Sequence, residues 1–463
     1  MKIEFVNHAS YIMDFGDIKL ISDPWIEGAV FNNGWDLISK TVFDYENFST
    51  ITHIWFSHEH PDHFYPPNIK KIPEKYRQNI TVLYQKTIDK KVVNYCGRLG
   101  FKEVIELSPD VPLKLSSDVS VTCNPWSEGD TYLYVKWPNA SCLNINDCGV
   151  LTEKEAKSIG DKFGDIDLLL TQFSLSAWEG NPEEVERRMG GAKAMLDRIL
   201  LQTNVLKPKF VIPLASYIWF CNVENFYINA QSNRIDMVED EIQKNTAAKP
   251  IVMYPGFSWE YGAFYSNDLA VSMHVKDFER LSLSLAYTNP VIPEDKLVKD
   301  AEKFIKTLLA SSSYFRLLIS FARSSYARRE LNASGSSIAK IKNVFQLCFL
   351  RLEPAKIYIV DLGKAFTFDL KRGLNPIDVS QAACDISLGS DSLSYGFLNL
   401  FGGETLQVNG RFSEGYDGGR MALFNYFHIA VALNRGVKVT WSRSIAQRIS
   451  KALPFLFPAV GNK

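Results

Sequence analysis

The seven residues SHEHPDH at Ser57–His63 contain three histidines and one aspartate, and they directly follow the apolar run Thr52–Phe56. An apolar run of this length predicts a buried strand, and Pro61 predicts that the strand gives way to a turn. Loops at the edge of a sheet are where α/β folds commonly place their functional sites. This stretch is therefore the first candidate for a functional site.

The spacing of the donors in this stretch predicts a site for two metal ions. In extended chain His58 and His60 project to the same side, because side chains alternate with period two. The turn then brings Asp62 and His63 to a second point nearby. Two imidazoles at one point, with a carboxylate and an imidazole a few ångströms away, suit two adjacent divalent cations. A solvated turn rich in histidine is the alternative, and the clustering of these donors after one strand argues against it.

The composition is that of an ordinary globular protein and gives no electrostatic argument for a nucleic-acid partner. The 463 residues are 46% hydrophobic and 22% charged, with a formal net charge of −1. The seven cysteines are scattered and form no C-x-x-C pair, which argues against a disulfide framework or a zinc knuckle and favours a reducing cytoplasm.

No feature of the sequence predicts a signal peptide or a membrane-spanning helix. The amino terminus lacks a basic start followed by a long apolar run, and no stretch approaches ~18 uninterrupted apolar residues. The basic, amphipathic segment Trp441–Val460 could lie on a membrane surface, but a helix docked on its own domain is the favoured interpretation. We therefore expect a cytoplasmic protein without membrane contact.

Two patterns divide the chain. Up to about Ser266, short apolar runs alternate with helical candidates at Ile88–Leu99 and Pro182–Gln202, which predicts an α/β layered domain. After about Asp268 we expect Pro293–Arg329 to be largely helical, followed by a strand pair and a Gly-rich segment. This pattern predicts a catalytic domain over residues 1–270 and a smaller α+β accessory domain over residues 290–463. The strands of the first domain are expected at Ile3–Phe5, Tyr11–Met13, Ile18–Ile21, Ile54–Phe56, Thr81–Tyr84, Val119–Thr122, Tyr132–Val135 and Asp167–Thr171.

At Ser57–His63 the sequence resembles the metallo-β-lactamase superfamily, which implies an αββα sandwich and a dinuclear metal site. The segment VNHASYIMDFGDIKLISDPW at Val6–Trp25 looks like the opening hairpin of that family. The resemblance places Asp23 where an outer carboxylate orients a ligand histidine. His8 is expected either to approach the site or to be a structural histidine.

A closer likeness is to the metallo-β-lactamase-like part of the CMP-N-acetylneuraminate hydroxylase family. A weaker likeness continues around Asp385–His428. The segments that carry the likeness are Ser22–Trp35, Ser57–Lys70, Glu128–Val135, Leu143–Cys148 and Pro213–Ile228.

The resemblance implies further ligands and also shows two departures. Asp147 matches the aspartate that bridges both metals in the superfamily. The stretch that usually supplies another histidine holds Glu128 and Asp130 instead, with Glu128 slightly favoured, and a carboxylate there shifts the expected metal toward iron. The last expected histidine is replaced by Cys221 and Asn222, so the second metal is expected to be loosely held, completed by water or absent.

Several polar residues at strand ends are candidates for lining the substrate pocket, with an ordinary capped turn as the alternative. His274 and His428 lie outside all motifs and are expected to be structural. The pocket candidates are Gln172, Ser174, Trp178, Asn181, Asn225, Tyr227 and Asn229.

Hydrolysis is the favoured function, with metal-activated water attacking an ester, thioester, amide or phosphodiester and Asp62 or a metal-bound water handling the proton. The alternative is a di-iron oxygenase that hydroxylates a sugar-linked or carrier-linked substrate. The sequence holds no C-x-H pair for a Rieske cluster, so its electrons would come from a separate protein. A non-catalytic scaffold is the second alternative. The expected cofactors are two divalent ions, iron or zinc, and the expected partner is a small-molecule or carrier-linked substrate.

Overall fold

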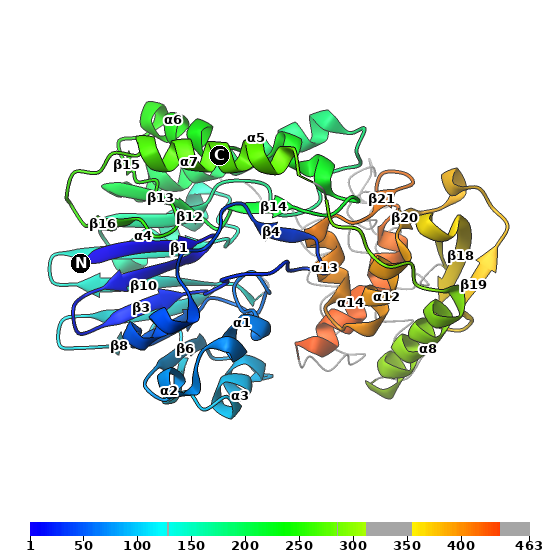
Figure 1. Ribbon diagram of the computed structural model, residues 1–463, viewed down its shortest axis with the longest axis horizontal. Helices are drawn as coiled ribbons and strands as arrows, with labels where there is room; N and C mark the ends of the chain where they lie inside the picture. Colours follow the sequence, from blue (N-terminus) through cyan, green and yellow to red (C-terminus); the bar gives the residue numbers. More distant parts are fainter. Residues whose placement is uncertain (127–128, 285, 312–353, 436–463) are drawn as a thin grey trace, which may run out of the picture. The chain divides into compact units, whose positions relative to one another are not determined.

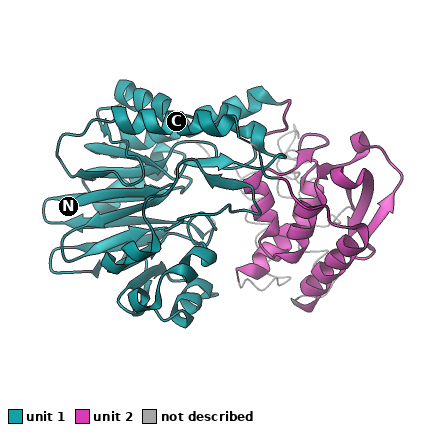
Figure 2. Ribbon diagram, viewed as in Figure 1, with its two compact units in different colours: residues 1–179, 184–287 teal, residues 180–183, 288–463 magenta. Residues whose placement is uncertain are grey.

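The computed structural model describes residues 1–126, 129–284, 286–311 and 354–435, which fall into two compact units. Unit 1 comprises Met1–Glu179 and Glu184–Tyr287, and unit 2 comprises Gly180–Glu183 and Thr288–Lys463 (Figure 2). The segment Gly180–Glu183 joins unit 2 because the side chain of Asn181 exchanges two hydrogen bonds, of 2.8 and 2.9 Å, with the main chain of Glu414. The assignment of catalysis to residues 1–270 and of an accessory role to residues 290–463 stays a prediction.

Unit 1 contains two seven-stranded sheets. The first has the order β16-β1-β2-β3-β5-β6-β7, and its strands β3, β5, β6 and β7 run parallel. Its strands are β1 (Lys2–Asn7), β2 (Ser10–Asp14), β3 (Lys19–Ser22), β5 (His53–Phe56), β6 (Thr81–Gln85), β7 (Glu103–Leu107) and β16 (Ser258–Glu260).

The second sheet has the order β15-β13-β12-β11-β10-β9-β8, with β11, β12, β13 and β15 parallel. The carboxyl ends of β5 and β11, from different sheets, both lead into the site described below. The strands of this sheet are β8 (Leu113–Lys114), β9 (Ser120–Pro125), β10 (Thr131–Trp137), β11 (Ala140–Asn146), β12 (Leu168–Gln172), β13 (Phe210–Leu214) and β15 (Lys249–Pro250).

The alternation of side chains along the central strands explains why the two sheets stack. In β5, Trp55 packs into the large core shared by both sheets, whereas Ile54 and Phe56 pack into a second core on the opposite face. In β6, Leu83 faces the shared core, and its neighbours face the second core. Because both faces of these strands are apolar, each sheet needs a cover of helices on its outer side.

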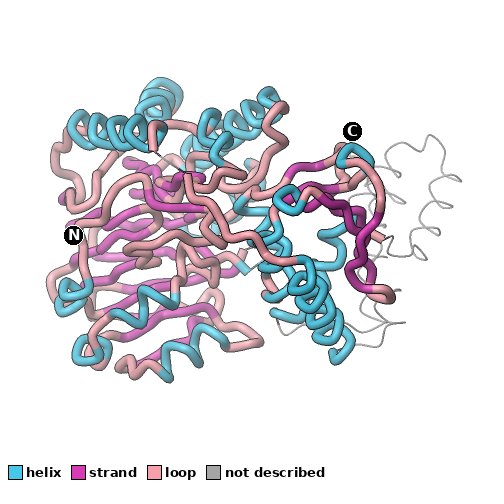
Figure 3. Tube along the Cα trace, turned by 45° about the vertical axis from the view of Figure 1, so that its right-hand side comes forward, coloured by secondary structure: helices cyan, strands magenta, loops and turns pink. Residues whose placement is uncertain are grey.

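Helices cover both outer faces of the sandwich (Figures 1 and 3). On the first sheet lie α1 (Pro66–Lys71), α2 (Glu74–Arg77) and α3 (Lys91–Arg98). On the second lie α4 (Glu153–Phe163), α5 (Val185–Leu206), α6 (Ile235–Asn245) and α7 (Asp268–Ser282). The short strands β4 (Trp35–Leu37) and β14 (Ile218–Phe220) form a separate pair, and 3₁₀ helices occupy Tyr45–Thr50 and Phe226–Gln231. The arrangement confirms the predicted αββα sandwich.

Unit 2 confirms the expected smaller α+β fold, with a five-stranded sheet in the order β19-β18-β17-β20-β21. Its helices enclose an aromatic core in which Phe304, Phe368, Phe397 and Phe427 contact one another. Its elements are α8 (Glu294–Ser311), β17 (Ala355–Ile359), β18 (Lys364–Asp369), β19 (Gly373–Ile377), β20 (Ile386–Leu388), α12 (Ser390–Leu398), α13 (Gly402–Asn409), β21 (Ser413–Glu414) and α14 (Met421–Asn434), with 3₁₀ turns at Val360–Leu362 and Gln381–Ala383.

The Gly-rich segment of unit 2 forms helix α13 because its glycines allow close packing. A Cβ atom at Gly403 would lie 2.3 Å from that of Phe427 on α14, so a larger residue would push the two helices apart. The predicted tail Trp441–Val460 lies outside the described residues. Among the helices that are described, none combines the length and the apolar character needed to cross a bilayer.

Candidate metal centre

The histidine-rich stretch forms a tight turn immediately after β5. The carbonyl of His60 accepts hydrogen bonds from the backbone N–H groups of His63 (3.0 Å) and Phe64 (2.7 Å). Pro61 suits the second position of this turn, because its fixed φ fits and it has no N–H to leave unpaired. His58, Asp62 and His63 are buried, and ionisable groups are rarely buried unless they are paired or bind a metal.

A first group of donors consists of His58, His60 and Asp130, whose ligand atoms all lie within 4.8 Å of one another. The His58 Nε2 and His60 Nδ1 atoms are 2.8 Å apart, and Asp130 Oδ1 lies 3.9 Å from His58 Nε2. Asp130 immediately precedes β10, and a backbone hydrogen bond from Trp126 to its carbonyl closes the preceding loop. The structure thus brings one of the two acidic candidates to the paired imidazoles.

A second group consists of His58, His63 and Asp147, and Asp147 directly follows β11. Its Oδ2 atom lies 3.5 Å from His58 Nε2 and 3.5 Å from His63 Nε2. Asp147 is therefore equidistant from one histidine of each predicted metal position. This is the placement that a bridging carboxylate needs.

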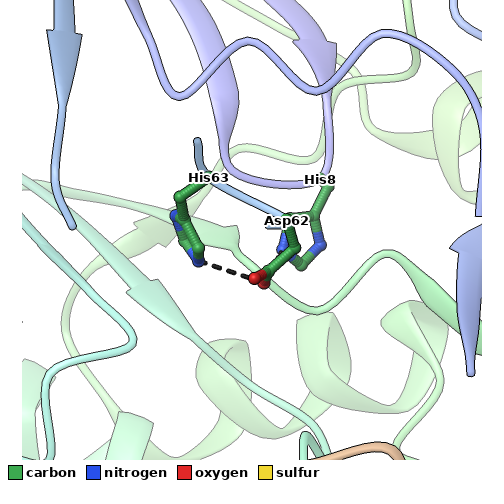
Figure 4. Close-up of side chains that lie close together, drawn as sticks. All are labelled: His8, Asp62 and His63. Carbon is green, nitrogen blue, oxygen red and sulfur yellow. Dashed lines mark hydrogen bonds and ion pairs between the residues drawn. The ribbon is translucent and has the colours of Figure 1, made fainter. Parts of the chain in front are cut away.

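A third group joins His8, Asp62 and His63 (Figure 4). The Oδ2 atom of Asp62 lies 3.1 Å from His63 Nε2 and 3.2 Å from His8 Nε2. His8 occupies the turn between β1 and β2 with a φ of +42°, and its N–H donates to the Asn7 side chain (2.9 Å). The structure therefore places His8 at the site, which the sequence left open.

One buried carboxylate fixes the orientation of the cluster from behind. Asp23 follows β3 with a φ of +36°, and its Oδ2 atom lies 2.9 Å from His63 Nδ1. The same carboxylate accepts hydrogen bonds from the N–H and the hydroxyl of Ser57 (2.7 Å each) and from the Asn146 side chain (2.9 Å). With Nδ1 held by Asp23, the free nitrogen of His63 is Nε2, which faces Asp62 and Asp147.

The charges in the cluster are arranged so that the carboxyl groups stay ionised. Burial alone would raise the pKa of Asp62, but His63 and His8 hold it well below its usual range. Burial likewise opposes ionisation of Asp147, and His58 and His63 overcome this effect and lower its pKa. Burial lowers the pKa of His58 well below its usual value, so its imidazole is neutral and its lone pair is available to a metal.

Two buried ligand atoms fit a metal because they lack other partners. Asp62 Oδ1 and Asp147 Oδ1 are buried and have no hydrogen-bond partner among the described residues. A buried polar atom without a partner costs free energy, which a coordinated cation would offset. The donor set of imidazole and carboxylate groups suits iron or zinc. The group with Asp147 shares His58 with the first group and His63 with the third, so the three groups are contiguous.

Other predicted site residues are not part of the cluster. Glu128 lies outside the described residues. The Asn222 side chain bonds to the Asn33 carbonyl (3.4 Å) and to the Glu224 N–H (3.2 Å), and Cys221 Sγ also points to the Asn33 carbonyl (3.4 Å). Local hydrogen bonds therefore hold both side chains in the loop after β14. The expectation that the second metal is loosely held, completed by water or absent stays a prediction.

The predicted pocket residues are mostly engaged in structural hydrogen bonds. Gln172 bonds to Ala215 and Arg198. Ser174 accepts from the Asn233 N–H, and Asn229 bonds to the backbone of Phe220. The other candidates are similarly placed: Trp178 is buried beside the Arg187 guanidinium, Tyr227 lies under Arg188, Asn225 bonds to Gly34, and Asn181 belongs to unit 2.

Sequence reasoning did not assign two residues that support the cluster. Asn146 donates to Asp23 (2.9 Å) and to Ser57 Oγ (3.0 Å), and Ser57 Oγ also lies 3.0 Å from His58 Nδ1. Each precedes a predicted ligand in the chain, and a buried polar residue at a strand end is the signal that would have identified it.

Comparison with known proteins agrees with this architecture. Residues 2–107 match the family described as a beta-lactamase superfamily domain. The chain is 25% identical over 256 residues to the cytidine monophosphate-N-acetylneuraminic acid hydroxylase of Xenopus laevis, which covers 52% of this chain and 42% of the relative. It is 24% identical over 282 residues to the mouse hydroxylase (Mus musculus), which covers 57% of this chain and 47% of the relative. The chain thus spans about half the length of the curated relatives it matches.

Two solved structures are similar to part of this chain. CmlA, a diiron beta-hydroxylase from Streptomyces venezuelae, matches with a TM-score of 0.38 and 17% identity over 54% of this chain and 52% of that chain. An isothiocyanate hydrolase from Delia radicum gut bacteria matches with a TM-score of 0.40 and 13% identity over 57% of this chain and all of that chain.

Proposed function

We propose that unit 1, which carries a metallo-β-lactamase superfamily domain, holds two metal ions and hydroxylates its substrate with molecular oxygen. His58, His60, Asp130 and Asp147 would hold the first ion, and Asp62, His63 and Asp147 would hold the second. Ligand atoms that bind one metal at about 2.1 Å lie roughly 3–3.5 Å apart. The separations of 3.1 Å between Asp62 and His63 and of 3.5 Å between Asp147 and each histidine agree with this geometry.

The position of Asp130 is the observation that carries the choice of oxygenation over hydrolysis. Zinc hydrolases of this fold place an imidazole where this chain offers a carboxylate, and iron accepts such mixed ligation well. The curated relatives reported above are named as hydroxylases, which supports the same choice. When bound, two irons would activate oxygen with two electrons and two protons, so that the products are the hydroxylated substrate and water. The electrons would come from a separate electron-carrier protein.

The residues of the chain have separate tasks in this proposal. Asp23 fixes the His63 ring, and Ser57 and Asn146 fix Asp23. His8 contacts Oδ2 of Asp62, and Oδ1 of the same carboxylate has no hydrogen-bond partner among the described residues. His8, Asp62 and His63 are buried, which keeps bulk water from this side of the cluster, whereas His60, Asp130 and Asp147 are partly exposed.

Hydrolysis remains the second candidate, and Asp62 is the observation that favours it. Its Oδ1 atom is buried and has no hydrogen-bond partner among the described residues, so it could accept the proton of a metal-bound water. With zinc in both positions, the same site would then cleave an ester, thioester, amide or phosphodiester.

Metal analysis of the purified full chain, grown with iron and zinc both supplied, tests the proposal. We expect about two irons per chain and oxygen uptake when a reductant and the substrate are present. Two zinc ions with anaerobic turnover of a thioester or phosphodiester would favour the hydrolase. No bound metal in any preparation would overturn both functions. His60→Ala should lose metal while the chain stays folded, and His53→Ala, which changes a histidine of β5 outside the cluster, is the matched control.

A further inference from the structure

We propose that Arg198 on helix α5 is an anion-binding residue beside the metal centre, and that the substrate therefore carries a carboxylate, phosphate or similar oxyanion group. This inference rests on the metal centre of the proposed function, and it names the substrate class for the same site.

The strand register places Arg198 close to the bridging carboxylate. Strands β11 and β12 run parallel, with Asn146 opposite Thr171. Asp147 follows Asn146, and Gln172 follows Thr171. Because neighbouring strands lie about 4.8 Å apart, Asp147 and Gln172 are neighbours at this edge of the sheet. Because Arg198 Nη2 donates to Gln172 Oε1 at 2.6 Å, the guanidinium lies at the strand end adjacent to Asp147.

Three further contacts show that this position is fixed. The Gln172 Nε2 atom donates to the Ala215 carbonyl (3.1 Å), which turns Oε1 toward the guanidinium. One helical turn after Arg198, the Gln202 side chain bonds to the Thr171 hydroxyl (2.6 Å) and to the Val150 carbonyl (3.0 Å). This face of α5 is therefore tied to the ends of both strands, and Arg198 cannot swing freely into solvent.

The charge of Arg198 is not matched by a carboxylate in direct contact. No Asp or Glu of the described residues lies within ion-pair distance of its guanidinium, whose one hydrogen bond goes to a neutral amide. Its Nε atom is buried and has no partner in the same part of the chain.

Metal binding would leave the charge of Arg198 less well neutralised. Asp147 is the carboxylate whose charge acts on Arg198, and in the proposed function it is shared between two divalent cations. A half-buried guanidinium beside two cations is then unfavourable unless another anion is present. An oxyanion of the substrate would satisfy both the metals and the planar fork of the arginine, which matches carboxylate and phosphate groups.

Sulfate binding to the metal-loaded full chain tests this inference, because sulfate is redox-inert and a weak metal ligand. Isothermal titration calorimetry should detect sulfate binding to the unchanged chain, and Arg198→Gln should weaken it at least about tenfold. Gln172→Glu is the second variant. It supplies an internal carboxylate at the amide position, so it should weaken sulfate binding while the arginine is still present. Lys193→Gln removes one exposed cation from the same helix and should bind sulfate like the unchanged chain.

Metal content measured on the same samples separates the inference from the proposed function. If two metals are bound and Arg198→Gln binds sulfate as well as the unchanged chain, the anion-binding role of Arg198 is wrong and the metal centre stands. Equal weakening in Lys193→Gln would show a general charge effect and would also overturn the inference. If the unchanged chain binds no metal, the proposed function itself fails.

Discussion

The Oδ2 atom of Asp23 lies 2.9 Å from Nδ1 of His63, and this one contact determines which nitrogen of His63 faces the metal centre. Asp23 comes from the loop after β3 and His63 from the turn after β5, and these two strands are parallel neighbours. The strand pairing thus positions a carboxylate behind a ligand without any sequence proximity between the two.

Replacing Asp23 by Asn should weaken metal binding by about ten- to hundredfold, because the amide cannot accept all the hydrogen bonds that orient His63. Competition with a chelator of known affinity measures this change. Asp14→Asn is the control, since this partly exposed carboxylate on β2 pairs with Lys19 at the surface. Equal affinity in Asp23→Asn and the unchanged chain would contradict the orienting role.

Changing His8 should affect mainly the second metal position, because its Nε2 contacts Oδ2 of Asp62 at 3.2 Å. We expect His8→Ala to lower the affinity for the second ion about tenfold, whereas His8→Gln keeps a hydrogen-bond donor and should retain most of it. Stepwise metal titration resolves the two ions. If His8→Gln bound the second metal ion as weakly as His8→Ala, the role of His8 as a hydrogen-bond donor would be refuted.

Asp130 should decide the metal preference of the first position. Asp130→His restores an imidazole where the superfamily usually has one and should shift the bound metal from iron toward zinc. Elemental analysis of chains grown with both metals measures the ratio of iron to zinc. An unchanged ratio in this variant would show that Asp130 is not a ligand.

His274 should make the unfolding free energy depend on pH. Burial lowers its pKa from 6.5 to about 4, against a hydrogen bond to the Met253 carbonyl. The folded state keeps the ring neutral, whereas the unfolded state binds a proton below about pH 6.5. The free energy of unfolding is therefore greatest above pH 6.5 and decreases as the pH falls from 6.5 toward 4. When the pH falls from 8 to 5, protonation of His274 should lower the free energy of unfolding by about 2 kcal/mol.

Denaturant unfolding at both pH values, compared with His274→Gln, measures this contribution, because the other histidines cancel in the difference. In His274→Gln, most of the change of about 2 kcal/mol in the free energy of unfolding between pH 8 and pH 5 should be absent. The same pH dependence in both chains would show that another group is responsible.

The sequence predicted the local parts of the site well. Period-two alternation and the position of Pro61 predicted a turn that brings His58, His60 and His63 together, and the structure places their rings side by side, with ring centroids 4.5 Å and 4.2 Å from that of His58. The layered fold also followed from pattern, because apolar strands alternating with helices have few ways to bury both faces of a sheet.

The residues that sequence reasoning missed act across long chain separations. Asn146 meets Asp23 across 123 positions, and Arg198 meets Gln172 from a helix whose face cannot be read from spacing alone. The hydrogen bond from Asn222 to the Asn33 carbonyl is of the same kind, because it joins residues 189 positions apart in the sequence.

The two metal positions can be located by anomalous diffraction at the iron and zinc absorption edges, from crystals of the full chain grown with both metals. We expect two iron peaks, one about 2 Å from His58 Nε2 and His60 Nδ1 and one about 2 Å from Asp62 and His63, with Asp147 between them. Fully loaded crystals with no peak at these side chains, or with the imidazoles turned apart, would contradict this expectation.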